Sequence, residues 1–427
     1  MQWHQGGCHL ANKELRQKHG GAIYYHTRNN DFSRLGVMKK SAFTTSLWPL
    51  PLRALRNMAA GCILFSLFVA PFAWAGFDEG MQAYNKGDYA TALREFRLLA
   101  DQGNAGAQSH LGNMYHEGNG VPQSYAEAAK WYRLAADNGF ALAQYNLGVM
   151  YYHGNGVPKD YAEAVKWYRL AAGQKNASAQ YNLGVMYAEG KGVRQDNAEA
   201  MNWFRLASDQ GDSKAQFNMG QMHRMGKGVP QNDAEAVKWY SLAAAQGNAS
   251  AQFHLGNMYR EGKGVPQNHA EGVRWYRIAA GQGEVLAQLF LGAMYYRGES
   301  VSKDYAEAAK WYHLAAEQGD VIAQYNLGLM YYRGDGVKQD YAQAAKWYHL
   351  AAEQGSANAQ FNLGGMYYQG WGVKQNDTDA YKWFILAAER GNKSASLLMS
   401  SIAEQMQPGQ IALAKEAAKA WSEKHKR

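Results

Sequence analysis

The stretch "AQYNLGVMYYHGNGVPKDYAEAVKWYRLAA", residues 143–172, decides the fold of this 427-residue chain. It contains two apolar segments with helical spacing, separated by a Gly-x-Gly-Val-Pro turn. In the first segment, Met150 and Tyr151 follow Leu147 by three and four residues. The turn would disrupt a helix that passed through it, because proline lacks the backbone N–H that a helix needs. The stretch therefore predicts two short helices joined by a tight turn.

Eight copies of this pattern follow one another with a period of 36 residues and without an insertion or a deletion. The tryptophan of the second segment recurs at Trp131, Trp167, Trp203, Trp239, Trp275, Trp311, Trp347 and Trp383. A glycine inside the first segment recurs at Gly112, Gly148, Gly184, Gly220, Gly256, Gly292, Gly328 and Gly364. A fixed period of this size is typical of repeat arrays, in which each unit buries its apolar face against its neighbours. We therefore expect both columns to be structural, the tryptophans as core residues and the glycines where two helices approach closely.

The ends of the second helix are marked in every copy. Ser, Asp or Asn follows the turn, and Glu, Gln or Asp stands three places later, as Asp160 and Glu163 do. This spacing predicts a capping box, in which the cap side chain contributes about 1 kcal/mol. Seven of the eight second helices are followed by a glycine suited to the left-handed conformation. Lys175 takes that place in the second copy, where we expect a cost of about 1 kcal/mol.

The basic charge of the chain is concentrated in its first 75 residues. The chain has 44 Lys and Arg against 36 Asp and Glu, a formal net charge of +8. Nine of the basic residues but only two of the acidic ones lie in residues 1–75, so the remainder is almost neutral. Phosphate binding depends on a clustered cationic surface, and we therefore expect no nucleic-acid partner. Both cysteines, Cys8 and Cys62, also lie in this segment, which leaves none for disulfides or thiolate metal sites elsewhere.

Residues 58–75, "MAAGCILFSLFVAPFAWA", have the features of a secretory signal peptide. They follow Arg53 and Arg56, contain a short apolar run, and end in a small-x-small motif. The run is short for a membrane span, which needs roughly 20 residues. We expect cleavage after Ala75 and a periplasmic or secreted mature protein; an uncleaved N-terminal anchor is the alternative.

Residues 1–57 precede this signal and are expected to be unstructured or wrongly included, because signal peptides seldom begin so far upstream. The lysine pair in "MKKS" at Met38 is typical of a natural start, with Met1 and Met58 as alternatives.

The motif A-x-A-Q-Y-N-L-G-x-M-Y-x-x-G-x-G-V-P-x-D-Y-x-x-A-x-x-W-Y-x-x-A-A resembles the Sel1-like repeat, a relative of the tetratricopeptide repeat, over residues 104–391. "YNKGDYATALREF", residues 84–96, resembles a tetratricopeptide-type helix pair, which we expect to occupy residues 76–103. Residues 392–427 are expected to form C-terminal capping helices. The resemblance implies an all-α, right-handed superhelical solenoid of antiparallel helix pairs. It also implies a non-enzymatic scaffold that holds a protein or peptide in its concave groove.

The chemical groups of the repeats do not form a catalytic or metal-binding pattern. His313 and His349 share a column with arginines, which is typical of a solvated helix face. Ser300 and Lys303 match the Ser-x-x-Lys pattern of penicillin-interacting enzymes, but their Ser-Asp-Asn and Lys-Thr-Gly partners are missing. We therefore predict no enzyme activity, metal or cofactor, and keep a β-lactamase-like or wall hydrolase as a remote alternative.

The copies differ from one another on one stripe of the first helix. Five and nine places after the glutamine of "AQ", side chains point about 140° and 180° away from it, opposite the packed face. The partner-binding candidates on this stripe are Asn113, Glu117, His153, Glu189, Gln221, Met225, Asn257, Glu261, Arg297, Arg333 and Gln369. The family's first helices line the concave side, so this stripe is expected to contact the partner. Its charge changes along the array to basic at Arg297 and Arg333, which suits an extended protein or peptide.

Cell-envelope glycan, either peptidoglycan or exopolysaccharide, is the alternative ligand, although the stripe has few aromatic side chains for ring stacking. Neighbouring tyrosines, among them Tyr152 and Tyr296, are further possible contacts.

Overall fold

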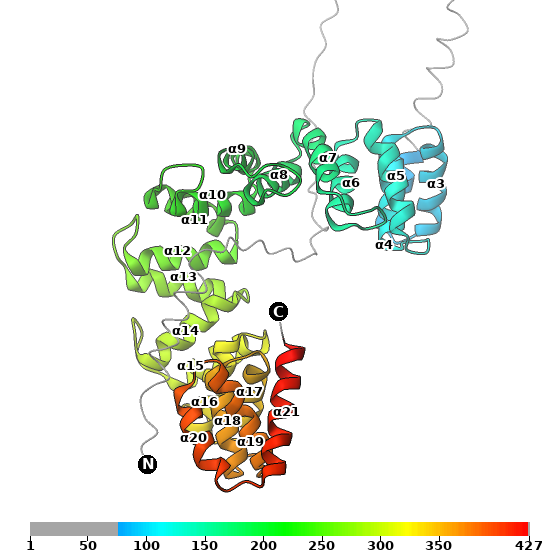
Figure 1. The fold of residues 1–427 in the computed structure, drawn as a ribbon. Coiled ribbons are helices and arrows are strands. Elements are labelled where there is room, and N and C mark those ends of the chain that lie inside the picture. Colours follow the sequence, from blue (N-terminus) through cyan, green and yellow to red (C-terminus); the bar gives the residue numbers. More distant parts are fainter. Residues whose placement is uncertain (1–75, 426–427) are drawn as a thin grey trace, which may run out of the picture. The chain divides into compact units, whose positions relative to one another are not determined.

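The structure, a computed structural model, describes residues 76–425, and every regular element in this range is a helix (Figure 1). The predicted all-α fold is therefore confirmed. The described chain falls into two compact units, an N-terminal unit of residues 76–215 and a C-terminal unit of residues 216–425. The predicted extension, signal segment and cleavage site after Ala75 lie outside the described residues.

In the N-terminal unit, residues 76–85 are helical. They are followed by α3 (Tyr89–Asp101), α4 (Ala105–Glu117), α5 (Tyr125–Asp137), α6 (Ala141–His153), α7 (Tyr161–Gly173), α8 (Ala177–Glu189) and α9 (Asn197–Asp209). The boundary between the units falls within α10 (Ser213–Met225). The C-terminal unit continues with α11 (Asp233–Ala245), α12 (Ala249–Glu261), α13 (His269–Gly281), α14 (Val285–Arg297), α15 (Tyr305–Glu317), α16 (Val321–Arg333), α17 (Tyr341–Glu353), α18 (Ala357–Gln369), α19 (Asp377–Glu389), α20 (Lys393–Ala403) and α21 (Pro408–Lys424).

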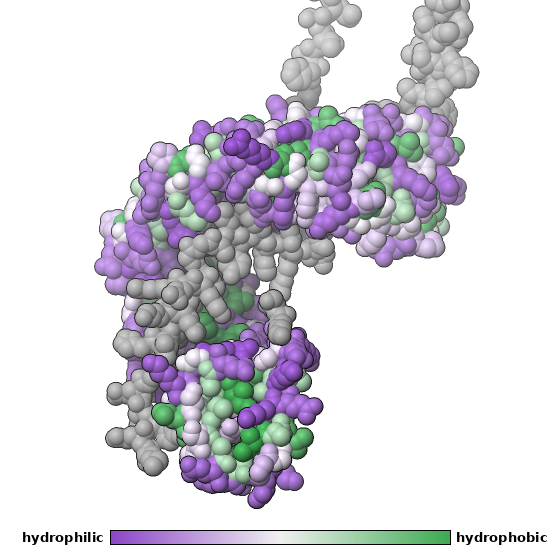
Figure 2. All heavy atoms as spheres, viewed as in Figure 1, coloured by the Kyte–Doolittle hydropathy of each residue, from purple (hydrophilic) through white to green (hydrophobic). Residues whose placement is uncertain are grey.

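Each repeat contributes two helices of 13 residues, such as α6 and α7. Within each unit, helices pack on their neighbours along the chain; α5, for example, contacts both α4 and α6. This arrangement is the predicted solenoid of stacked helix pairs with a 36-residue period. Polar side chains cover most of the visible face of the N-terminal unit, with separate apolar residues between them (Figure 2). No helix within residues 76–425 combines the length and the apolar character that crossing a membrane would require.

The core consists of clusters that join neighbouring repeats. In one cluster, Tyr132 of α5, Leu147 and Met150 of α6, and Trp167 of α7 pack together. The tryptophan thus packs into a core that the second helix of the preceding repeat shares with the first helix of its own repeat. Trp167, Trp347 and Trp383 are buried, and the other five tryptophans of the column are partly buried.

The glycine inside each first helix makes room for an aromatic ring from the second helix. A Cβ atom on Gly148 would lie only 2.6 Å from Cδ1 of Tyr168, the residue after the column tryptophan. Gly184 faces Phe204 in the same way, with a Cβ distance of 2.5 Å. The glycines therefore allow a close approach, as predicted. The group that approaches is an aromatic ring of the second helix, which packs on the backbone of the first.

The predicted caps form, but the predicted capping box is only half present. The carboxylate of Asp160 accepts hydrogen bonds from the backbone N–H groups of Ala162 and Glu163, at 2.8 and 3.0 Å. The backbone N–H of Asp160 does not bond to Glu163; it donates to the carbonyl of Tyr151, at 2.9 Å. The turn brings that carbonyl within reach, so Glu163 is left to pair with Lys166 at 3.3 Å.

The helix C-termini follow the sequence prediction. Gly139 and its equivalents have positive φ angles, 81° at Gly139. Lys175, which replaces the glycine in the second copy, adopts the same conformation with φ 64°.

A ladder of glutamines ties successive repeats together. The side-chain amide of Gln144, which is 4% exposed, donates to the carbonyl of Ala136, at 3.1 Å. Its oxygen accepts a hydrogen bond of 2.9 Å from Gln174, which stands at the end of the next second helix. In the last repeat Arg390 occupies the position of Gln174, and the buried oxygen of Gln360 has no hydrogen-bond partner among the described residues. The ladder ends where the repeats end.

Candidate partner-binding surface

The predicted stripe lies on the first helices, but its residues differ in exposure. Glu117, His153, Glu261, Arg333 and Gln369 are exposed. Asn113, Glu189, Met225, Asn257 and Arg297 are partly buried. Gln221 is only 2% exposed, so its assignment to the contact surface is wrong. Its amide lies 3.3 Å from Nε2 of His254, in the next repeat, and this contact holds it inside the array.

The asparagines of the stripe also have a role within the array. The hydroxyl of Tyr132 donates to Oδ1 of Asn113 at 2.6 Å, and that of Tyr276 donates to Asn257 at 2.8 Å. These tyrosines are buried, and their hydroxyls need an acceptor there. Asn113 and Asn257 therefore hold the core in place as well as bordering the surface.

The charged members of the stripe form polar contacts within the array, and Arg333 forms one between two repeats. Arg333 donates to the hydroxyl of Tyr296 at 3.2 Å, and this hydroxyl donates to Asp335 at 2.9 Å. In the N-terminal unit, Lys191 donates to the hydroxyl of Tyr152 at 3.0 Å and pairs with Glu189 at 2.7 Å. The tyrosines that the sequence suggested as ligand contacts therefore join one repeat to the turn of the next.

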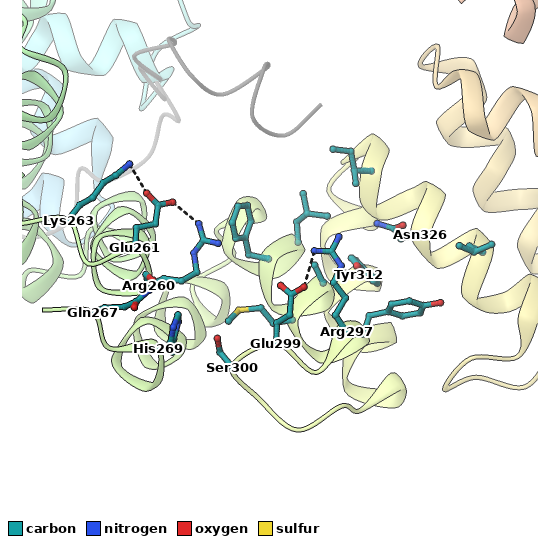
Figure 3. A pocket seen from close by; sticks show the side chains of 17 residues that line it. Arg260, Glu261, Lys263, Gln267, His269, Arg297, Glu299, Ser300, Tyr312 and Asn326 are labelled. Carbon is teal, nitrogen blue, oxygen red and sulfur yellow. Dashed lines mark hydrogen bonds and ion pairs between the residues drawn. The ribbon is translucent and has the colours of Figure 1, made fainter. Parts of the chain in front are cut away.

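Two candidates, Glu261 and Arg297, line a pocket of about 720 Å³ in the C-terminal unit (Figure 3). The pocket lies between the first helices α12, α14 and α16 and is bordered by the turns after α12 and α14. Apolar side chains and charged groups both line it. The other candidates do not contribute to this pocket.

An exposed aromatic group lies in the turn after α18. Trp371 is 40% exposed, and its ring stacks on Tyr341 with 5.6 Å between the ring centroids. Tyr332 packs against the same indole at 5.8 Å. Trp371 lies outside the predicted stripe, but the sequence carries a signal for it, because the equivalent turn position is polar in the other seven repeats.

Three histidines, His254, His313 and His349, pack against aromatic rings of neighbouring repeats. His313 and His349 make edge-to-face contacts with Trp347 and Trp383 of the following repeats, at 5.6 and 5.8 Å. Burial, reinforced by the charge of Arg224, lowers the pKa of His254 to about 3. Within residues 76–425, no group of three or more His, Cys, Asp or Glu side chains is placed to hold a metal ion.

Ser300 and Lys303 do not have the arrangement that the Ser-x-x-Lys pattern requires. Residues three apart on a helix share one face, but both residues lie in the turn before α15. Ser300 has a positive φ of 65°. The ammonium group of Lys303 lies over the ring of Tyr305, 4.6 Å from its centroid.

Comparison with known proteins agrees with this architecture. The family model described as the Sel1 repeat matches eight consecutive segments, which together cover more than half of the chain: residues 105–140, 141–176, 177–212, 213–248, 249–284, 285–320, 321–356 and 357–392.

Among solved structures, a Sel1 repeat protein from Oxalobacter formigenes is 36% identical, with a TM-score of 0.57. The match covers 73% of this chain and 90% of that one. The protein c5321, described as a protective antigen present in uropathogenic Escherichia coli strains displaying an SLR fold, is 32% identical over 85% of this chain and 94% of its own, with a TM-score of 0.48. No curated protein gave a significant match.

Proposed function

Because the chain belongs to the Sel1 repeat family, we propose that it is a non-enzymatic scaffold that binds a protein or peptide on its first helices. Repeats of this kind are typical of protein–protein interaction. The observation that supports the proposal most directly is the division of labour within each repeat. Tryptophan and glutamine columns join the repeats, and the glycine column packs the two helices of each repeat. Exposed positions of the first helix, such as Glu261 and Arg333, vary from copy to copy.

We further propose that the protein works in the bacterial cell envelope or outside the cell. The support is the signal-like segment at residues 58–75 and the absence of cysteine after it in the sequence. A chain without thiols cannot form wrong disulfides in an oxidising compartment. N-terminal sequencing of the exported protein tests this directly, with Ala75 as the expected last residue of the signal.

The scaffold proposal is tested by affinity capture from the envelope fraction, followed by mass spectrometry. A double variant, Arg297→Glu with Arg333→Glu, reverses two charges on the first helices. The matched control, Lys238→Glu with Lys310→Glu, reverses two exposed charges on second helices of the same unit. We expect captured partners to be lost only from the arginine variant. Equal capture by both variants would count against the first helices as the binding face.

Envelope glycan is a second candidate ligand, and the exposed Trp371 favours it. An indole that already stacks on Tyr341 offers a rigid apolar surface for a sugar ring. Pull-down with purified peptidoglycan and with exopolysaccharide tests this candidate. We expect Trp371→Ala to reduce the retained protein, whereas Leu397→Ala, at another exposed apolar residue, should leave it unchanged. Retention that is independent of Trp371 would remove the reason for this candidate.

A further inference from the structure

Both apolar and charged side chains line the pocket between α12, α14 and α16. Phe290 and Ala293 of α14 and Leu329 of α16 are among the apolar ones. Its volume of about 720 Å³ falls within the range of roughly 300–1,000 Å³ that is usual for sites that enclose small ligands. In Figure 3, Arg260, Glu261 and Lys263 lie at the left of the pocket, and Arg297 and Glu299 lie between them and Asn326. A ligand in this space would meet both kinds of surface at once.

The sixth repeat departs from the column pattern at three positions, and all three residues line the pocket. Phe290 stands where five of the eight repeats have asparagine, and it supplies an aromatic wall. Ala293 takes the position of Asn257 in the preceding repeat. Because its side chain ends at Cβ, it leaves the space beside Tyr312 unfilled, whereas Asn257 reaches the hydroxyl of Tyr276.

The third departure is Ser300, where the other repeats have the second glycine of the turn. That glycine approaches the preceding repeat closely, since a Cβ atom on Gly336 would lie 2.2 Å from the carbonyl carbon of Tyr305. A serine cannot occupy such a position, so the turn at Ser300 must stand further from the start of α13. His269, the first residue of α13, and Ser300 both line the pocket.

On the α14 side of the pocket, the positive group is less exposed than the negative one. The side chain of Arg297 is 25% exposed, and it pairs at 3.6 Å with Glu299, whose side chain is 61% exposed. On the other side, the guanidinium of Arg260 lies over the ring of Phe290, 5.5 Å from its centroid. A carboxylate that enters the pocket can compete with the exposed Glu299 for Arg297, because a guanidinium binds carboxylates through charge-assisted hydrogen bonds.

We propose that this pocket binds a short peptide segment in which a bulky apolar side chain stands next to a carboxylate. The apolar side chain packs between Phe290, Ala293 and Leu329, and the carboxylate pairs with Arg297. This inference rests on the proposed scaffold function and names the chemistry of its anchor point. Matching an apolar anchor with a flanking charge fixes both the position and the direction of the bound segment.

The test uses the full chain and a random heptapeptide phage library. We expect the enriched peptides to carry an aromatic or large aliphatic residue beside Asp or Glu. The most enriched peptide is then synthesised with a fluorescent label, and its affinity is measured by fluorescence anisotropy. Ala293→Trp fills the pocket and should weaken binding at least tenfold.

Gly365→Trp is the matched control, because Gly365 occupies the same column two repeats later, outside the pocket and with no atom within 4 Å of its Cβ position. It should change the affinity less than twofold.

The charge is tested separately, which keeps the inference falsifiable if Ala293→Trp perturbs folding, as circular dichroism would reveal. Arg297→Glu should weaken binding at least tenfold, and Arg297→Lys should restore part of it. Enriched peptides without the apolar–acidic pattern, or affinities unchanged by Ala293→Trp and Arg297→Glu, would overturn the inference. If Ala293→Trp still captures the same envelope partners as the wild type, the pocket is not the anchor but the scaffold proposal stands. If no envelope partner is captured while the peptides bind as expected, the scaffold proposal fails and the pocket remains.

Discussion

Gly364 and Gly365 are neighbours in α18, and substitution by alanine should stabilise the protein at Gly365 but not at Gly364. A Cβ atom on Gly364 would lie 2.9 Å from Cδ1 and Cε1 of Phe384 and 3.1 Å from the carbonyl oxygen of Ala380. A Cβ atom on Gly365 would have no neighbour within 4 Å. The pair therefore separates the conformational cost of glycine from its packing role within one turn of one helix.

The magnitudes follow from two opposing effects. Replacing glycine by alanine inside a helix stabilises it by about 1 kcal/mol, and this gain applies at both positions. At Gly364 the added methyl group also presses on Phe384, which is 0% exposed and cannot turn toward solvent. Overpacking of this kind costs about 1–3 kcal/mol. We expect Gly365→Ala to stabilise the protein by about 1 kcal/mol and Gly364→Ala to be about 1–3 kcal/mol less stable than Gly365→Ala.

Urea unfolding followed by circular dichroism measures the difference. Midpoints are compared only between variants with equal m-values, because repeat arrays can unfold in parts. In a Phe384→Leu background the difference between the two alanine variants should shrink, since the ring that the methyl group meets is gone. Equal stability of Gly364→Ala and Gly365→Ala in the wild-type background would refute the ring-on-glycine account.

Three further predictions concern stability. Lys175→Gly should raise the free energy of unfolding in urea by about 1 kcal/mol, because glycine adopts a φ of 64° without strain, whereas Lys175→Ala should not. Gln174→Ala should cost about 1–3 kcal/mol in the same assay, because it leaves the buried oxygen of Gln144 without its donor; a loss of a few tenths would contradict the ladder. Because burial lowers the pKa of His254 to about 3, the unfolded chain binds a proton there first as the pH falls below about 6.5, and stability decreases by up to about 1.4 kcal/mol per pH unit. His254→Asn should flatten this slope between pH 6.5 and 4.5, and an unchanged slope would exclude His254 as its cause.

The features that the sequence predicted correctly are those in which the cause lies within a few residues. The second helix begins at Asp160 because an acceptor there meets N–H groups two and three residues later. The helix ends before a residue in the left-handed conformation, and Lys175 adopts this conformation although it is not a glycine. The period then repeats these local signals eight times, which removes the ambiguity that a single copy would leave.

The predictions that failed needed knowledge of contacts between segments. The half-formed capping box depends on the carbonyl of Tyr151 reaching the backbone N–H of Asp160 across the turn. Gln221 lies on the stripe predicted to face outward, but the neighbouring repeat covers it. The position of a residue around the helix predicts the direction in which its side chain points. It does not predict whether a neighbouring helix covers that side chain.

The pocket shows why function is harder to read from a repeat sequence than fold. Phe290, Ala293 and Ser300 each break a column, and each break taken alone has a plain explanation as a surface variation. The three breaks lie on α14 and the turn after it, and the packing of α14 between α12 and α16 makes them part of one pocket beside Arg297. A column that keeps one residue type in every copy serves contacts that every repeat makes. Residues that differ from the column pattern in one repeat only do not serve these shared contacts. They are therefore positions at which a single repeat can acquire a binding site.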